Sequence, residues 1–182
     1  MEYLENTIKL LTYYKSLGER AMEQLNEEEV HLAPGDDTNS IAIIVKHLHG
    51  NMLSRWTNFL KEDGEKEWRK REEEFKDSIA TKKELLEKWK EGWTCFLGTL
   101  TSLKADDLNQ TVYIRNEGHS VLDAIQRQLA HYSYHIGQIV FLSKMIKGEN
   151  WNTLSIPKGE SKAYNEKKFR KAKENRHFTD RV

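Results

Sequence analysis

The chain has 182 residues, which is enough for a single domain with a buried core. Hydrophobic residues make up 37% of it, charged residues make up 32%, and there are only 2 prolines. This composition is typical of a soluble, largely helical protein with strongly charged outer faces. The 29 Lys and Arg residues balance the 29 Asp and Glu residues, so no overall field draws the chain to nucleic acid or to a membrane surface.

Three features of the sequence bear on cellular location. No segment approaches the roughly 20 consecutive apolar residues of a membrane span. The acidic start, Met-Glu-Tyr-Leu-Glu, is not followed by an apolar run and does not resemble a signal peptide. The single cysteine, Cys95, cannot form a disulfide within the chain, which favours a reducing compartment. We therefore expect a cytoplasmic protein that does not bind membranes.

The first half of the chain predicts two amphipathic helices. Apolar residues recur at helical spacing from about residue 2 to residue 26. The sequence Pro34-Gly35-Asp36-Asp37 then breaks the chain, and Thr38, Asn39 and Ser40 are candidate N-caps for a second helix that extends to about Leu60. Residues 61–78 are so dense in Lys, Arg and Glu that they indicate a solvated connection, which could be partly helical.

The second half predicts two further helices. The third spans about residues 79–103, and its aromatic series is assigned mainly to the core, as is Trp56. That series comprises Trp89, Trp93 and Phe96. A break at 104–118 follows, in which residues 111–114 could form a short strand. Ser120 and Asp123 resemble a capping box for a fourth helix that ends at about Lys147.

Four amphipathic helices of matched length bury their apolar stripes best when they lie side by side. The sequence therefore predicts an all-α protein with a four-helix bundle over residues 1–157. Residues 158–182 carry nine Lys or Arg against four Asp or Glu. This pattern predicts a basic C-terminal extension that is loosely packed or partly disordered. A nucleic-acid-binding arm is the alternative, but the neutral remainder of the chain gives it little support, and we expect no nucleic-acid partner.

The most informative segment is His131-Tyr-Ser-Tyr-His135-Ile-Gly-Gln138. On an α-helix, two imidazoles four residues apart differ by about 40° around the axis and by about 6 Å along it. One metal ion can take two nitrogen ligands at this spacing. The intervening residues lack the Glu of the H-E-x-x-H metalloprotease motif. The competing interpretation is a pair of surface or half-buried histidines that hydrogen-bond to neighbouring carbonyl groups.

A catalytic metal site needs a third protein ligand, and the second helix offers His47 and His49. These two residues point about 160° apart around the helix axis, so at most one of them can join the same site. Their positions relative to the apolar stripe do not decide between them. His47 shares its side with several polar residues, which favours it weakly as a ligand in a cleft open to solvent.

The motifs Ser40-Ile41-x-x-Ile44-Val45-x-His47-Leu48 and His131-x-x-x-His135-x-Gly137-Gln138 resemble the DinB-like (YfiT-like) superfamily of metal-binding four-helix bundles. The resemblance covers about residues 1–147. It is strongest to a branch described as a domain of unknown function (DUF1572-like), and continues through residues 63–66 and 154–159. It implies that His47, His131 and His135 hold the metal and that the protein forms a homodimer.

A divalent ion held by three neutral imidazoles keeps its full charge and remains a strong Lewis acid. It can activate a water molecule or a thiol. The ligand set suits zinc, nickel, copper or iron, and affinity order does not choose among them. Members of the resembling superfamily include transferases and isomerases that use low-molecular-weight thiols such as bacillithiol or mycothiol. The resemblance thus implies a metal-dependent thiol S-transferase or a hydrolase with a small thiol co-substrate.

Three residues are candidates for the surroundings of the metal: Gln138, Asn51 and Tyr134. Gln138 follows His135 by three residues and could orient a ligand or a bound water. Tyr134 has an ordinary pKa of about 10 and is a poor base at neutral pH. No catalytic base is therefore assigned. The alternative function is a non-catalytic, dimeric metal-binding bundle with a structural or stress-related role.

Overall fold

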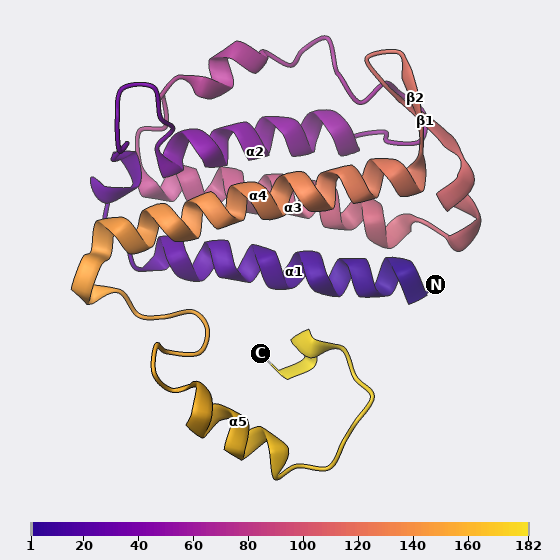
Figure 1. The fold of residues 1–182 in the computed structure, drawn as a ribbon. Helices are drawn as coiled ribbons and strands as arrows, with labels where there is room; N and C mark the ends of the chain where they lie inside the picture. The colour runs from indigo at the N-terminus through magenta and orange to yellow at the C-terminus, as the bar shows by residue number, and fades with distance from the viewer. Residues whose placement is uncertain (1, 182) are drawn as a thin grey trace.

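The computed structural model describes residues 2–181. Four long helices lie side by side along a common direction (Figure 1). They are α1 (Glu2–Glu23), α2 (Ile41–Trp56), α3 (Lys82–Ser102) and α4 (Val121–Lys147). Helix α2 packs along α3 and α1 packs along α4, while contacts of α1 with α3 and of α2 with α4 complete the assembly. The prediction of an all-α helical bundle is confirmed.

Hydroxyl side chains set the starts of three of these helices. Ser40 accepts a hydrogen bond from the backbone N–H of Ile43, and Ser120 accepts one from that of Asp123. Thr81 caps α3 in the same way. Each cap satisfies one of the N–H groups that the first turn leaves without a partner. Helix α2 ends at Trp56, earlier than expected, because Asn58 adopts a positive φ of 51° that turns the chain out of the helix.

The aromatic series predicted to be core is buried. Trp56, Trp89, Trp93 and Phe96 have exposed fractions of 3% or less. The Trp56 ring lies 4.6 Å from that of Phe96, and Tyr132 of α4 packs edge-on against Phe96 at 5.0 Å. These rings join α2, α3 and α4 at the centre of the bundle. The faces of α2 and α4 that carry the histidines are therefore held at fixed positions.

A short hairpin precedes α4, where the sequence indicated only one possible strand. Strands β1 (Thr111–Ile114) and β2 (Glu117–Ser120) pair antiparallel. The turn residues Arg115 and Asn116 both have positive φ, which is the geometry of a two-residue type I′ turn. The Asp63 carboxylate accepts hydrogen bonds from both of their backbone N–H groups at 2.8 Å. This anchor fixes the hairpin against the connection between α2 and α3.

The connection between α2 and α3 departs from the prediction of a solvated segment. It contains the 3₁₀ helix η2 (Arg71–Phe75), which packs against α2. Two charged residues of this connection, Glu74 and Lys66, are buried. The prediction of exposure was wrong for these two residues, because it rested on their charge alone. Buried charges are tolerated where opposite charges and hydrogen bonds surround them.

The C-terminal extension leaves the bundle after α4 and returns toward α1 (Figure 1). Helix α5 (Ser161–Phe169) has no buried residue. Further on, Phe178 packs edge-on against Tyr13 at 5.3 Å, and Asp180 pairs with Lys9 at 3.2 Å. Among residues 2–181, no helix combines the length and apolar character needed to cross a membrane.

Candidate metal centre

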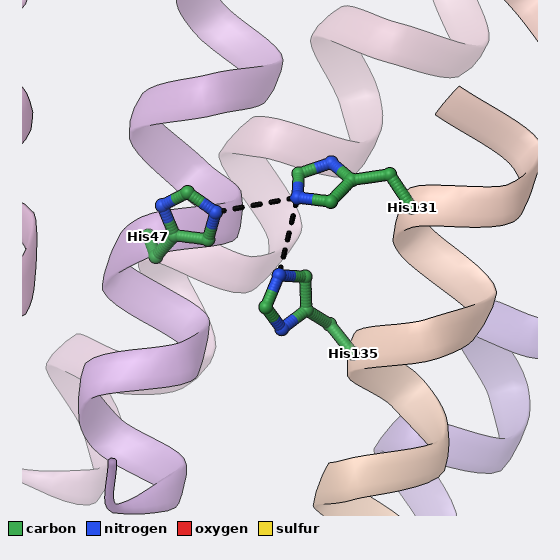
Figure 2. Close-up of side chains that lie close together, drawn as sticks. All are labelled: His47, His131 and His135. Carbon is green, nitrogen blue, oxygen red and sulfur yellow. Dashed lines mark hydrogen bonds between the residues drawn. The ribbon is translucent and has the colours of Figure 1, made fainter. Parts of the chain in front are cut away.

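Three histidines from two helices converge at one point (Figure 2). The Nε2 atom of His131 lies 3.4 Å from that of His47 and 3.1 Å from that of His135. His47 comes from α2, and the other two come from successive turns of α4. Helix α4 supplies both because residues four apart share a face, and α2 lies against that face.

The outer nitrogen of each ring faces an oxygen atom. His47 Nδ1 lies 2.9 Å from a carboxylate oxygen of Glu74. His131 Nδ1 lies 3.2 Å from Oε1 of Gln128, and His135 Nδ1 lies 2.7 Å from Oε1 of Gln138. A carboxylate or amide oxygen only accepts, so each Nδ1 carries the proton and donates it. In the neutral form of each ring, Nε2 then presents a lone pair to the centre of the cluster.

Burial keeps two of these rings neutral. Loss of hydration, together with the neighbouring His135 and His47, lowers the pKa of His131 to about 3. Loss of hydration also lowers the pKa of His135 to about 4, against the opposing effect of its hydrogen bond to Gln138. A neutral imidazole is the form that binds a metal ion.

This donor set fits a divalent metal ion. His131 Nε2 lies 3.1–3.4 Å from the other two Nε2 atoms, and all three ligand atoms lie within 4.8 Å of one another. Lone pairs this close repel unless a cation lies between them. Tetrahedral zinc with Zn–N bonds of about 2.0–2.1 Å requires nitrogen separations of about 3.3 Å. The three side chains form the one group of three or more potential ligands that residues 2–181 bring within reach of a single ion. They could hold such an ion without large rearrangement.

Glu74 is the most important residue of the site that the sequence did not reveal. Its carboxylate accepts hydrogen bonds from Arg69 Nε at 2.7 Å and from Arg69 Nη2 at 2.9 Å, in addition to the bond from His47. Burial raises the pKa of Glu74, but the bonds from His47 and Arg69 lower it below its ordinary value overall. Phe75, the next residue, stacks on the His47 ring at 5.0 Å. No periodic pattern in residues 61–78 marks these contacts.

The other candidate residues lie outside the group of three histidines. Asn51 is buried and accepts a hydrogen bond from the Tyr132 hydroxyl, and Tyr134 is exposed with its ring edge-on to that of His135 at 5.0 Å. His49 points away from the cluster, and its Nε2 bonds to Glu91 of α3 at 2.8 Å. The structure thus brings His47, and not His49, to the pair on α4.

A family model described as "Protein of unknown function (DUF1572)" matches residues 1–160. The chain belongs to this family. No curated protein and no solved structure matches the chain. The matched residues include the whole bundle and all three histidines, and they end just before α5.

A pocket of about 240 Å³ opens beside the cluster in this DUF1572 protein. His47 and His131 form part of its wall, together with Asn51 and Gln128. Neither Tyr134 nor Gln138 lines it. The pocket therefore provides access to the histidines from the side of α2 that faces the connection and the hairpin turn.

Gly50 gives a test of the Glu74 contact. A Cβ atom at this position would meet the Glu74 carboxylate, whose Cδ would lie only 2.8 Å away. Glycine inside a helix ordinarily reduces stability by about 0.5–1 kcal/mol relative to alanine, so this close approach explains its presence. We expect Gly50→Ala to displace Glu74 from His47, to lower the free energy of unfolding by about 1–3 kcal/mol and to weaken metal binding by about tenfold.

The control for this substitution is Gly98→Ala in α3, where an added Cβ meets nothing within 4 Å. It should raise the free energy of unfolding by about 0.5–1 kcal/mol and leave metal binding unchanged. Chemical denaturation and metal titration of both variants measure these effects. If Gly50→Ala behaved like Gly98→Ala in both measurements, Glu74 would have no role in holding His47.

Proposed function

We propose that this protein is a metal-dependent enzyme of the DinB-like superfamily, most concretely a low-molecular-weight thiol S-transferase or a hydrolase. The observation that carries the proposal is the convergence of three imidazoles beside an open pocket. In the proposal, His47, His131 and His135 hold a divalent zinc, nickel or iron ion. The ion, when bound, supplies Lewis acidity that lowers the pKa of a coordinated water or thiol.

The surrounding residues hold the ligands in place. Glu74, Gln128 and Gln138 accept the Nδ1 protons and thereby fix both the tautomer and the orientation of each ring. Glu74 is committed to His47 and Arg69, so it is poorly suited to act as a base toward a substrate. Among the described residues, no Asp or Glu lines the pocket. The absence of a carboxylate base favours thiol transfer over peptide hydrolysis.

In the proposal, the protein is a homodimer and is located in the cytoplasm. The resemblance to the DinB-like superfamily supports a homodimer. Cys95 is a free thiol, and burial raises its pKa, which suits a reducing compartment such as the cytoplasm. Its high pKa and its position away from the pocket lining exclude it from the proposed chemistry.

The proposal is tested with the Co²⁺-substituted protein, whose absorption spectrum reports on the ligands of the ion. Addition of 2-mercaptoethanol should change the spectrum saturably, because the thiolate enters an open coordination position. Ethylene glycol, which replaces the sulfur by oxygen, should not produce this change. His49→Ala should respond like the wild type, since His49 points away from the cluster.

An unchanged spectrum in the presence of thiol would mean that the ion has no accessible position. The protein would then be a non-catalytic metal-binding bundle. Failure of the wild type to bind Co²⁺ or Zn²⁺ at all would remove the basis of both functions.

A further inference from the structure

The pocket beside the histidine cluster is lined by arginines from four separate parts of the chain. They come from α2, from the connection between α2 and α3, from the hairpin turn and from α4: Arg55, Arg69, Arg71, Arg115 and Arg127. Such convergence of guanidinium groups is unfavourable unless negative charge offsets it. Nearby carboxylates or a bound anion must therefore balance these positive charges.

The carboxylates of the protein offset only part of this charge. Three glutamates pair with four of the five arginines: Glu65, Glu72 and Glu74. One oxygen of Glu65 is shared by three of them, at 3.2–3.5 Å. Asp63 also lies close enough to Arg55 for the two charges to interact, so four carboxylates face five arginines. Arg127 has no carboxylate partner among the described residues, and a bound anion would offset this excess of positive charge.

Arg55 shows where such an anion would bind. Its side chain is only 7% exposed, and its single ion pair is a long contact of 3.5 Å between Nη2 and Glu65. The Nε and Nη1 atoms are buried and have no hydrogen-bond partner among the described residues. Buried N–H groups of a charged side chain are rarely left without acceptors, because the loss of hydration is costly. The Arg55 side chain forms part of the pocket wall, so an anion bound in the pocket could supply an acceptor to this guanidinium group.

We propose that the arginine pocket binds the oxyanion group, a carboxylate or a phosphate, of a small substrate whose reacting end lies at the histidine cluster. Guanidinium groups bind both kinds of oxyanion through paired N–H donors. His47 and His131 lie in the same wall as the arginines, so one small molecule can contact both. The assignment of the reacting end rests on the proposed function, whereas the anion site rests on the arginines alone.

The test is a calorimetric titration of the metal-free protein with inorganic phosphate and with succinate, at constant ionic strength set by chloride. At least one of the two anions should bind saturably with one site per chain, and the tighter one identifies the preferred group. Arg55→Gln and Arg127→Gln should each weaken this binding by about tenfold or more. Arg170→Gln removes the same charge from the exposed extension and should leave it unchanged.

Arg127 is exposed on α4, so its substitution tests the pocket even if Arg55→Gln does not fold. The inference is overturned if neither anion binds saturably, or if Arg170→Gln weakens binding as much as the pocket variants do. His135→Ala separates this inference from the proposed function, because His135 does not line the pocket. Anion binding should persist in that variant.

The two possible failures are therefore distinct. If the wild type binds metal but neither anion, the inference falls and the metal site stands. If it binds an anion but no metal, the arginine pocket stands as an anion site, and the assignment of a substrate with its reacting end at the cluster falls.

Discussion

Replacement of His135 by alanine should abolish stoichiometric metal binding while the protein stays folded. The wild type presents three Nε2 donors to one point, and this variant presents two. Loss of an outer hydrogen-bond partner of a metal ligand typically weakens binding by about 10–100-fold, so loss of the ligand itself should exceed that range. The measurement is metal content after loading and dialysis, followed by competition with a chelator of known affinity.

Stability and metal binding should separate in this variant. His135 is half-buried, and its pKa is lowered mainly because burial removes its hydration. Its ring also contributes one of the three lone pairs that repel in the metal-free state. Truncation to alanine removes both the burial of this polar ring and the repulsion of its lone pair. We therefore expect the free energy of unfolding of the metal-free protein to change by less than about 1 kcal/mol. Unfolding of the metal-free variant in denaturant measures this.

Two companion variants test the choice between the neighbouring histidines of α2. His47→Ala should lose the metal as His135→Ala does, and His49→Ala should keep it, because His49 is bonded to Glu91 on the other side of the helix. Wild-type metal affinity in His135→Ala or His47→Ala would show that the cluster is not the metal site. Loss of the metal in His49→Ala alone would reverse the assignment.

The helices were predictable because they depend on local patterns. Apolar spacing located all four, and Ser40 and Ser120 start α2 and α4 as their capping patterns indicated. One element of the fold was not predictable in this way. The strand β2 has the sequence Glu-Gly-His-Ser, which has little β propensity, and it pairs because the Arg115–Asn116 turn and Asp63 hold it next to β1.

The site was predictable only where its geometry is local. His131 and His135 share a face of one helix, so their spacing alone indicates that they lie together. The choice of His47 over His49 depends on how α2 is rotated against α4, which the sequence periodicity left open and the family resemblance supplied. Glu74 and Arg69 lie in a segment without periodicity, and their burial depends on one another and on His47. Such mutual dependence leaves no pattern in a single sequence.

Because Glu74 and Arg69 depend on one another, substitution of Glu74 should cause a large loss of stability. Glu74→Ala would leave the Arg69 guanidinium, whose side chain is only 2% exposed, without its principal partner. Removal of one member of a buried ion pair typically lowers the free energy of unfolding by about 3–5 kcal/mol. The same substitution removes the acceptor of the His47 Nδ1 proton, so metal affinity should fall by about 10–100-fold.

Glu74→Gln separates these two roles. The amide oxygen still accepts the proton of His47, so metal affinity should stay within about tenfold of the wild type, but the charge that Arg69 needs is lost. Denaturant unfolding should therefore show a large loss of stability with little loss of metal binding. Glu73→Gln is the matched control, because Glu73 is exposed in the same 3₁₀ helix and pairs only with the exposed Lys76. It should change neither quantity measurably.

A double variant completes the test. If the destabilisation of Glu74→Gln arises from an unpaired Arg69, then Arg69→Met in the same chain should recover part of the lost stability, because the buried charge is removed. Its effect on metal affinity should be small, since the glutamine still orients His47. Additive losses of stability in the double variant would mean that Glu74 and Arg69 act independently. In that case the connection between α2 and α3 would support the metal centre through packing alone.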